Sequence, residues 1–333
     1  MHFLNEYIFF FAKTMTVVLS ILVIAGGLLV LVSKTKSKEK AGKLSVQNVN
    51  DKYKNYQETI NDATQTKIEK KLTKKTQKNQ AKLLGKHSRN RLFLLCFHGD
   101  IKASAVSSLR EEITAILLAK KSGDEVLLCV DSPGGLVHGY GLAAAQIQRL
   151  KDEKIRVTVA IDKIAASGGY LIACIADHII AAPFAIVGSI GVIAQLPNFH
   201  RWLEKNEIEF EQVYAGQYKR TLTLFGKNTP EGREKLQEEI NEAHDIFKAF
   251  IERYRPQVNI EQVATGEHWF ATRAIELNLL DEIKTSDDFL LTAKNTHDIY
   301  QVKYELKKSF IQRINAAANM LINKFWRLEQ SSY

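Results

Sequence analysis

The chain has 333 residues, 45% of them hydrophobic and 25% charged, so it is long enough for one or two domains with a full-sized core. Its net charge is +9, but residues 34–90 carry +11 and residues 1–33 are neutral, which leaves −2 for residues 91–333. A nucleic-acid-binding domain would carry its basic side chains on the folded part. This charge distribution therefore argues against nucleic acid as a partner.

The first predicted element is a membrane anchor within residues 1–33. Met15–Val32 is an apolar run of 18 residues without a charge, and together with Tyr7–Ala12 it reaches the roughly 20 residues that span a bilayer. The alternative, a cleaved signal peptide, has an apolar region of about 7–15 residues and a small-residue cleavage site. Five lysines follow the run within residues 34–43, and the positive-inside rule then predicts a cytoplasmic C-terminal side.

Residues 34–90 form a second segment, with 15 Lys and 1 Arg against 5 acidic residues and no proline. Apolar residues are sparse, so we expect a solvated helix or a disordered linker. Lysines near an anionic membrane surface would each add about 1 kcal/mol of attraction. Binding of nucleic acid by this linker is the weaker alternative, since aromatic residues are nearly absent apart from Tyr53 and Tyr56.

From Arg91 the chain alternates between predicted strands and helices. Continuous apolar runs are typical of strands that are buried on both faces, and the alternation predicts a parallel sheet with helices on its faces, an α/β fold. In such a sheet, binding sites form at the carboxyl ends of the strands. The predicted strands are 92–97, 125–131 and 155–161, and the predicted helices are 103–121 and 136–150.

The second half of the chain opens with another uncharged apolar run, residues 179–196. Pro183, Gly188 and Gly191 interrupt it, so two short core strands around a turn are favoured over a second membrane span. The chain ends in a basic amphipathic helix, 307–327, which we interpret as a packed or subunit-interface helix, with membrane-surface contact as the alternative. The other predicted elements are helices at 198–206, 230–254, 271–277 and 287–294 and strands at 208–214 and 280–283.

The three cysteines each lie in an apolar run, and none has the Cys-x-x-Cys spacing of a metal ligand. Neither a zinc site nor a disulfide framework is predicted. We expect all three to act as small buried hydrophobic side chains. They are Cys96, Cys129 and Cys174.

The junction at Ser167 is the strongest candidate for chemistry. The predicted strand 155–161 leads into it, a helix-compatible run leads out, and Ala165–Gly169 supplies small neighbours that let a substrate backbone come close. Amides at the start of a helix favour a nearby negative charge. The position therefore suits a nucleophilic oxygen, and the alternative is that Ser167 only caps the helix.

A nucleophilic serine needs a base, and several residues are candidates. The histidines near strand ends are His98 and His138. A triad of Ser167, His138 and Asp131 is one option, although nothing in the spacing singles it out. Lys163 lies four residues before the serine, but it follows a strand and is expected to point away from the pocket.

Five short motifs occur in a fixed order along the chain. Together they resemble the SppA/SohB family of membrane serine peptidases, and the likeness covers most of the chain, including the anchor and the lysine-rich spacer. The resemblance implies a fold like that of ClpP and crotonase and a Ser–Lys catalytic dyad. The motifs are Val130–Gly135 (VDSPGG), Ala165–Tyr170 (AASGGY), Val187–Val192 (VGSIGV), Ala215–Arg220 (AGQYKR) and Gly266–Trp269 (GEHW).

Site roles follow from this resemblance, position by position. Ser167 matches the nucleophile and Lys219 the general base. Gly134 and Gly135 match the oxyanion region, Gly168 adjoins the serine, and the turn from Gly188 to Gly191 matches the lining of the substrate groove. A lysine acts as a base only when it is neutral, and burial away from acids favours that form. No acidic residue lies between Val213 and Pro230, which fits this role, while the alternative for Lys219 is a solvated loop lysine.

The resulting prediction is a single-pass membrane serine endopeptidase of the bacterial inner membrane. Its substrates would be signal-peptide remnants or unfolded membrane-associated peptides, its partners membrane lipid and further copies of itself, and no metal or organic cofactor is implied. The resemblance places the catalytic domain at the outer face, against the positive-inside rule, so both sides stay open. The alternatives are a crotonase-like acyl-CoA enzyme and a catalytically silent membrane scaffold. The predicted segments are 1–33 (anchor), 34–90 (linker), 91–305 (peptidase domain) and 306–333 (C-terminal helix).

Overall fold

A computed structural model describes residues 2–35, 42–66, 68–70, 72 and 89–306. The chain divides into two compact units, one of residues 1–43 with 305–333 and the other of residues 44–304. The first unit contains helix α1 (His2–Thr35), which includes the predicted apolar run. Within α1, Tyr7–Ile24 is long and apolar enough to cross a membrane by length and composition. The predicted helix 307–327 lies outside the described residues.

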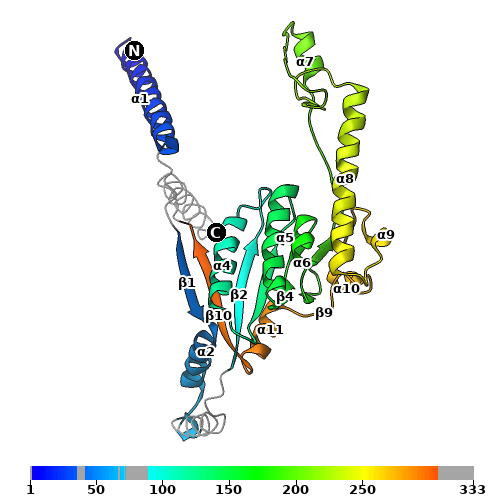
Figure 1. The fold of residues 1–333 in the computed structure, drawn as a ribbon. Helices are drawn as coiled ribbons and strands as arrows, with labels where there is room; N and C mark the ends of the chain where they lie inside the picture. The colour runs from blue at the N-terminus through cyan, green and yellow to red at the C-terminus, as the bar shows by residue number, and fades with distance from the viewer. Residues whose placement is uncertain (1, 36–41, 67, 71, 73–88, 307–333) are drawn as a thin grey trace. The chain divides into compact units, whose positions relative to one another are not determined.

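The second unit is built on a seven-stranded sheet (Figure 1). Every pairing from β10 through to β9 is parallel, as the alternation of strands and helices predicted. The strand order is β1 (Lys43–Asn48), β10 (His297–Glu305), β2 (Asn90–His98), β3 (Glu125–Asp131), β4 (Arg156–Ile161), β6 (His178–Ala181) and β9 (Glu282–Ile283).

A second, smaller sheet stands beyond the carboxyl end of the first. It contains β5 (Ile164–Ala166), β7 (Ile186–Gly188) and β8 (His268–Phe270). β5 and β7 run parallel, and β8 closes the sheet antiparallel to β7. An isolated bridge from Ser132 to Ala165 joins the end of β3 to this small sheet.

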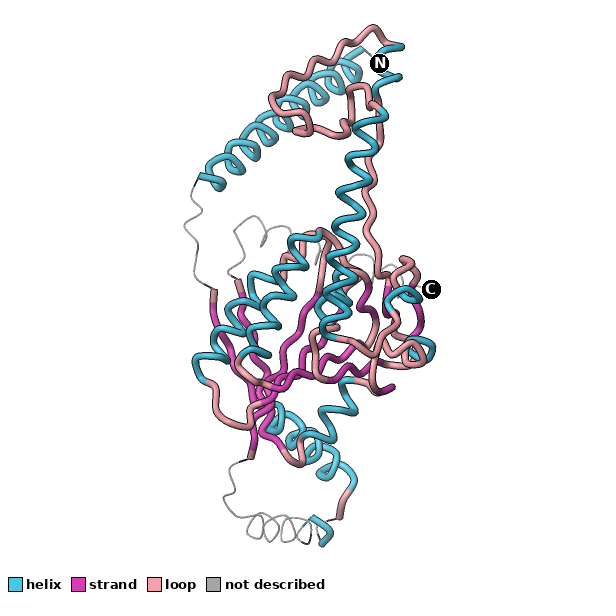
Figure 2. The backbone as a smooth tube through the Cα atoms, turned by 45° about the vertical axis from the view of Figure 1, so that its right-hand side comes forward, coloured by secondary structure: helices cyan, strands magenta, loops and turns pink. Residues whose placement is uncertain are grey.

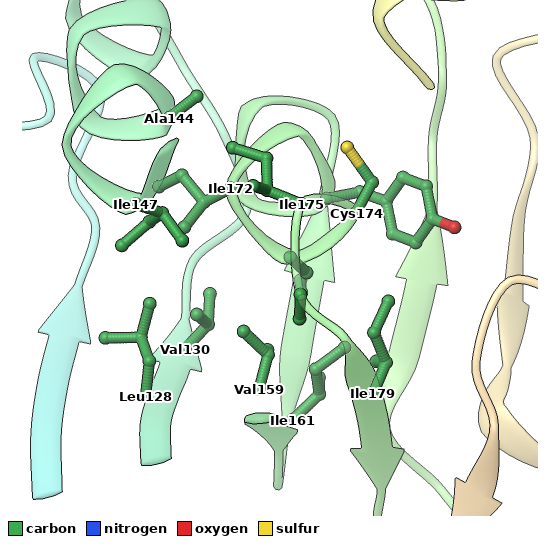
Figure 3. Packing of buried hydrophobic residues seen from close by; sticks show 14 of the residues in the cluster. Leu128, Val130, Ala144, Ile147, Val159, Ile161, Ile172, Cys174, Ile175 and Ile179 are labelled. Atoms are coloured by element: carbon green, nitrogen blue, oxygen red, sulfur yellow. The ribbon is translucent and has the colours of Figure 1, made fainter. Parts of the chain in front are cut away.

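Helices cover both faces of the large sheet (Figure 2). One face packs against α4 (Val106–Ala119), α5 (Val137–Asp152) and α6 (Gly168–Ala173), where Ile147 and Ile172 meet Val130 and Val159 (Figure 3). The other face packs against α2 (Val49–Thr64) and α11 (Ser286–Ala293). These apolar layers bury the strands on both faces, which explains their continuous hydrophobic runs.

Helix α8 (Pro230–Tyr254) has a long exposed part and a short buried one. Proline at the first position and the Thr229 hydroxyl, which accepts from Gly232 N, start the helix. Only Phe247 and Ile251, both in its last turns, are buried. The N-terminal half instead carries residues 192–229, here called the arm, which include the short helix α7 (His200–Lys205); α7 lies far from α6 in Figure 1.

The structure changes three of the predictions. The unit with the large sheet begins at Leu44, because β1 pairs with β10 and because α2 joins through Val49 and through Asn50 Oδ1, which accepts from Ile299 N. Residues 208–214 are not a strand, since they are exposed and no strand among the described residues pairs with them. Of the three cysteines only Cys174 is buried, whereas Cys96 is exposed and Cys129 is partly exposed.

The remaining predicted elements that fall on described residues are present, and several elements were missed. Strand β3 and helix α8 have the predicted bounds, and the other matched elements agree to within a few residues. Strands β8 and β10 were not predicted from the sequence. The short helix α9 (Ile260–Val263) was also missed, whereas α10 (Ala271–Ala274) corresponds to the predicted helix 271–277.

Candidate active site

Ser167 lies at the junction between strand β5 and helix α6. Its backbone φ is 52°, a strained value for a residue other than glycine, and its side chain makes no capping hydrogen bond to α6. Two hydrogen bonds fix the backbone: Ser167 N donates to Gly188 O at 2.7 Å, and Leu171 N donates to Ser167 O at 3.0 Å. The hydroxyl is therefore not used as a helix cap, and the strained turn between strand and helix is a geometry known for nucleophilic serines.

The turn after β3 lies directly against this serine. Gly134 has a φ of +92°, and a Cβ at this position would lie 2.8 Å from Ser167 Cβ and 2.9 Å from Gly168 N. Both the backbone conformation and the close approach require glycine. The structure thus brings together Gly134, Gly135, Ser167 and Gly168, as expected from the sequence.

Two amides near Ser167 are left without an acceptor in the described part of the chain. Gly135 N–H has no hydrogen-bond partner there, and Gly168 N–H is at the first position of α6, where the helix supplies none. Gly134 N–H, in contrast, donates to Ser132 Oγ at 3.2 Å. The geometry therefore favours Gly135 and Gly168 as oxyanion donors, with Gly134 holding the turn.

A buried chain of hydrogen bonds supports that turn. Ser132 Oγ accepts from Gly134 N and lies 2.6 Å from the Tyr140 hydroxyl, which donates to Asp100 O at 2.9 Å. Only glycine fits at position 168 beside this tyrosine, because a Cβ on Gly168 would lie 2.3 Å from the Tyr140 ring. Sequence analysis missed Ser132 and Tyr140, although Ser132 stands within the VDSPGG motif.

The turn from Gly188 to Gly191 is the third wall of the site. A Cβ on Gly188, whose φ is +107°, would lie 2.8 Å from the Trp269 ring. The turn is tied to the GEHW motif by Ser189 N, which donates to Glu267 O at 2.6 Å, and by Gly266 N, which donates to Ile190 O. The motif therefore supports the turn that carries Gly188 against Ser167.

An apolar cavity of about 160 Å³ lies beside Ser167. Its walls come from α5, α6 and the C-terminal half of α8, and they contain no charged side chain. A cavity of this kind suits one aliphatic side chain of a substrate rather than a charged one. Its apolar walls include Val137, Ala144, Leu171, Ile246, Phe247 and Phe250.

The candidate bases near the strand ends face away from this cavity. Asp131 Oδ2 lies 3.3 Å from Lys163 Nζ and 3.7 Å from His98 Nδ1, so Asp131 pairs with these two residues and not with His138. His138 is exposed at the start of α5. The structure thus assembles no triad of Ser167, His138 and Asp131, and it directs Lys163 toward Asp131.

Lys219 lies in the arm, exposed, with its N–H donating to Gly216 O. The arm contacts the first turns of α8, where Lys235 Nζ is 5.3 Å from the centre of the Tyr218 ring. The nearest residue of the same helix that lines the cavity beside Ser167 is Ala243, eight residues further along, which is about 12 Å at the α-helical rise. Within one chain of this conformation, Lys219 and Ser167 are therefore not brought together.

Among the described ranges, no group of three or more His, Cys, Asp or Glu side chains is arranged to hold a metal ion. A larger hollow of about 650 Å³ lies within the arm, lined by Glu204, Glu207, Glu209 and Glu211, and it includes neither Ser167 nor Lys219.

Comparison with known proteins identifies the class to which this fold and site belong. The model of peptidase family S49 matches residues 149–300, and the model of the S49 N-terminal region matches residues 2–147. The molecule is thus a peptidase built on a parallel α/β sheet. The chain belongs to peptidase family S49, which confirms the resemblance to the SppA/SohB peptidases.

Curated relatives agree over nearly the whole length. A probable protease SohB from Haemophilus influenzae is 43% identical and covers 95% of this chain and 93% of the relative. A second, from Buchnera aphidicola of Schlechtendalia chinensis, is 46% identical and covers 88% of this chain and all of the relative. Among solved structures, ClpP1 from Listeria monocytogenes is similar in fold, with 16% identity, a TM-score of 0.41 and coverage of 59% of this chain and 94% of that chain.

Proposed function

We propose that this peptidase is a membrane-anchored serine endopeptidase in which Ser167 is the nucleophile and Lys219 the general base. The observation that carries the proposal is the setting of Ser167, whose hydroxyl is free of capping and adjoins two unbonded amides and an apolar cavity. Ser167 Oγ attacks the carbonyl carbon of a peptide bond and gives its proton to the neutral amine of Lys219. Gly135 N–H and Gly168 N–H stabilise the negative oxygen of the tetrahedral intermediate.

The second half of the reaction follows from the same groups. The lysine returns the proton to the leaving amine, the carbon–nitrogen bond breaks, and an acyl-enzyme remains on Ser167. Water then adds to the ester under base catalysis by the same lysine, which releases the acid and restores the serine. The cavity accepts an apolar side chain, so substrates are peptides with an aliphatic residue next to the cleaved bond.

The lysine is supplied by a neighbouring copy of the chain. About 12 Å along α8 separates the contact of the arm at Lys235 from Ala243, the nearest residue of this helix that lines the cavity, which is more than a lysine side chain spans. The arm exposes many large apolar side chains, as an unassembled interface does. Burial of the arm by a second copy removes water from Lys219 and favours its neutral form. The exposed side chains include Ile193, Trp202, Ile208, Val213, Tyr214 and Tyr218.

The anchor defines where this chemistry occurs. Helix α1 contains a segment that can cross a membrane, so the peptidase acts on peptides at the bacterial inner membrane, on signal-peptide remnants or unfolded membrane-associated segments. Either face of the membrane is compatible with a single anchor of this kind.

The test is covalent labelling of the detergent-purified chain with a fluorophosphonate, followed by mass-spectrometric mapping. We expect label on Ser167 in the wild type and its loss in both Ser167→Ala and Lys219→Ala. Lys227→Ala, which removes another lysine of the arm, is the matched control and should keep the label. A folded, assembled wild-type chain without label on Ser167 would overturn the mechanism and favour the scaffold alternative.

A further inference from the structure

Two cysteines lie side by side on the face of the large sheet that is opposite to Ser167. Cys96 on β2 and Cys129 on β3 are direct partners in the parallel register. Cys129 packs against the apolar cluster beneath α2 and α11, so both side chains belong to that face. Cys96 is exposed and Cys129 partly exposed, so solvent reaches the pair.

The two sulfur atoms also interact with each other. A hydrogen bond from the Cys129 thiol lowers the pKa of the Cys96 thiol, assisted by Gln301 and Lys303 and opposed by burial and by Glu112. The same hydrogen bond, together with burial, raises the pKa of Cys129. Of the two thiols, Cys96 therefore ionises more readily than Cys129.

Strand geometry already sets the separation that a disulfide needs. Neighbouring strands lie about 4.8 Å apart, within the range of about 4.4–6.8 Å between the Cα atoms of disulfide-bonded cysteines. Thiol–disulfide exchange also requires an accessible thiolate and a second thiol within reach of the first. Cys96 and Cys129 meet these conditions without movement of the sheet.

We propose that Cys96 and Cys129 form a redox-active dithiol that exchanges with small soluble disulfides and closes a cross-strand disulfide between β2 and β3. This site is separate from the serine site, and its test uses no peptide substrate.

The exchange takes place in two balanced steps. The Cys96 thiolate attacks one sulfur of the small disulfide, forms a mixed disulfide and releases one thiolate, which takes up a proton. The Cys129 thiol then loses its proton and attacks Cys96 Sγ, which expels the second small thiol. Two protein thiols are oxidised by two electrons, and one small disulfide is reduced to two thiols.

The experiment treats the reduced, full-length protein in detergent with oxidised glutathione, traps free thiols by alkylation and maps them by mass spectrometry. We expect an intramolecular disulfide between the peptides that carry Cys96 and Cys129. The buried Cys174 is the internal control, because it should remain a free thiol that is alkylated only after unfolding. A stable glutathione adduct on wild-type Cys96, two unreacted thiols, or a disulfide between chains would each overturn the proposal.

Two variants separate the steps. Cys129→Ser should stop at a mixed disulfide between glutathione and Cys96, and Cys96→Ser should slow modification of Cys129 at least tenfold. In the wild type, iodoacetamide should modify Cys96 faster than Cys129 at neutral pH. Equal alkylation rates for the two wild-type thiols would contradict the assigned roles, and this measurement does not depend on the folding of any variant.

Discussion

The two halves of the proposed dyad occupy regions of opposite character. The serine side is buried and cross-linked by hydrogen bonds, from Ser167 N to Gly188 O and through Ser132 and Tyr140 to Asp100 O. The arm that carries Lys219 is exposed over most of its length and packs mainly on itself, as in the stacked rings of Phe199 and Phe225. The fold thus places the proposed nucleophile and its proposed oxyanion donors within one chain, while the proposed base is on a segment that packs mainly on itself.

Helix α8 connects these two regions and explains how they differ. Its C-terminal half lines the cavity beside Ser167, and its N-terminal half supports the arm through Gly232 and Lys235. The buried half contributes apolar contacts that stabilise the domain, and the exposed half contributes few. If the exposed half makes its contacts with another copy of the chain, assembly and catalysis should depend on each other.

The largest expected effect comes from separating the two halves of the dyad on different chains. Ser167→Ala and Lys219→Ala should each lower peptidase activity by at least about 10³-fold, because both groups act in the same step. Mixing the two inactive proteins under conditions that allow subunit exchange should restore activity. With the lysine supplied across a subunit interface, about one site in four of an equimolar mixture holds both groups.

The control for this mixture is the double variant, Ser167→Ala with Lys219→Ala, combined with wild-type protein. Adding the double variant should only lower the activity of the wild-type protein, because the double variant supplies neither group. Inactive mixtures of the two single variants, with subunit exchange verified by mass labels, would mean that the lysine acts within its own chain and that the arm must fold back toward Ser167.

The next largest effect concerns the anchorage of α8 on the serine side. Arg255, which is 3% exposed, donates to both carboxylate oxygens of Asp281 at 2.9 and 2.8 Å and so joins the end of α8 to the segment before β9. Arg255→Met leaves that carboxylate without its partner, and we expect a loss of about 3 kcal/mol in the free energy of unfolding, measured by urea denaturation. Arg253→Met, which removes an exposed arginine of the same turn, should cost no more than about 0.5 kcal/mol.

The contribution of the Arg255–Asp281 ion pair to stability should depend on pH. Burial alone would raise the pKa of Asp281, but hydrogen bonds from Arg255 and Ile179 N outweigh it and hold that pKa below its usual value. A carboxyl whose pKa is lowered by folding stabilises the protein above its unfolded pKa, about 3.9, and loses this contribution as the pH falls through the folded value. The stability difference between wild type and Arg255→Met should therefore shrink below about pH 4, and a constant difference would contradict the assignment.

A smaller effect is expected from the hydrogen bonds behind the oxyanion turn. Ser132→Ala removes the acceptor of Gly134 N–H and one partner of Tyr140, which should cost about 1–2 kcal/mol of stability. If the turn positions Gly135, kcat should also fall about tenfold with KM nearly unchanged, since the oxyanion contact is made in the transition state.

Tyr170→Phe is the matched control for that variant. Its hydroxyl is also buried and donates to a backbone carbonyl, Leu279 O at 3.0 Å, but it does not contact the turn of Gly134. It should lose similar stability and keep kcat. An equal loss of kcat in both variants would show that Ser132 only stabilises the fold.

The sequence predicts correctly those elements whose pattern lies within a single segment of the chain. Strand β3 is a continuous apolar run, and α8 begins at a proline and ends where its periodicity ends, so both have their predicted bounds. Strand β10 was missed because its pairing with β2 joins residues about 200 positions apart, which no local pattern reveals. Residues 208–214 have strand-like alternation but no neighbouring strand to complete their hydrogen bonds.

The features of the candidate site that could be predicted are those set by the backbone conformation of glycines. Glycines with positive φ and close contacts left a visible pattern around Ser167, at Gly134 and Gly188. The role of Ser132 depends on a side-chain contact with Tyr140, and Cys96 was expected to be buried because its strand is apolar. In the proposed mechanism the environment of Lys219 depends on a second copy of the chain, which no pattern within one sequence specifies.

The smallest effect on stability should accompany a large effect on assembly. Val213, on the arm, is 98% exposed, so Val213→Asp should change the free energy of unfolding by no more than about 0.5 kcal/mol. If this side chain is buried between subunits, the new carboxylate is desolvated there, and the oligomer should dissociate at concentrations where the wild type is assembled.

Leu118→Asp, at another highly exposed apolar position, on α4, is the matched control. Measured by analytical ultracentrifugation in detergent, dissociation in the first variant alone would assign the interface to the arm. Unchanged assembly in Val213→Asp would remove this part of the arm from the interface and leave the exposure of its apolar side chains without an explanation in self-association.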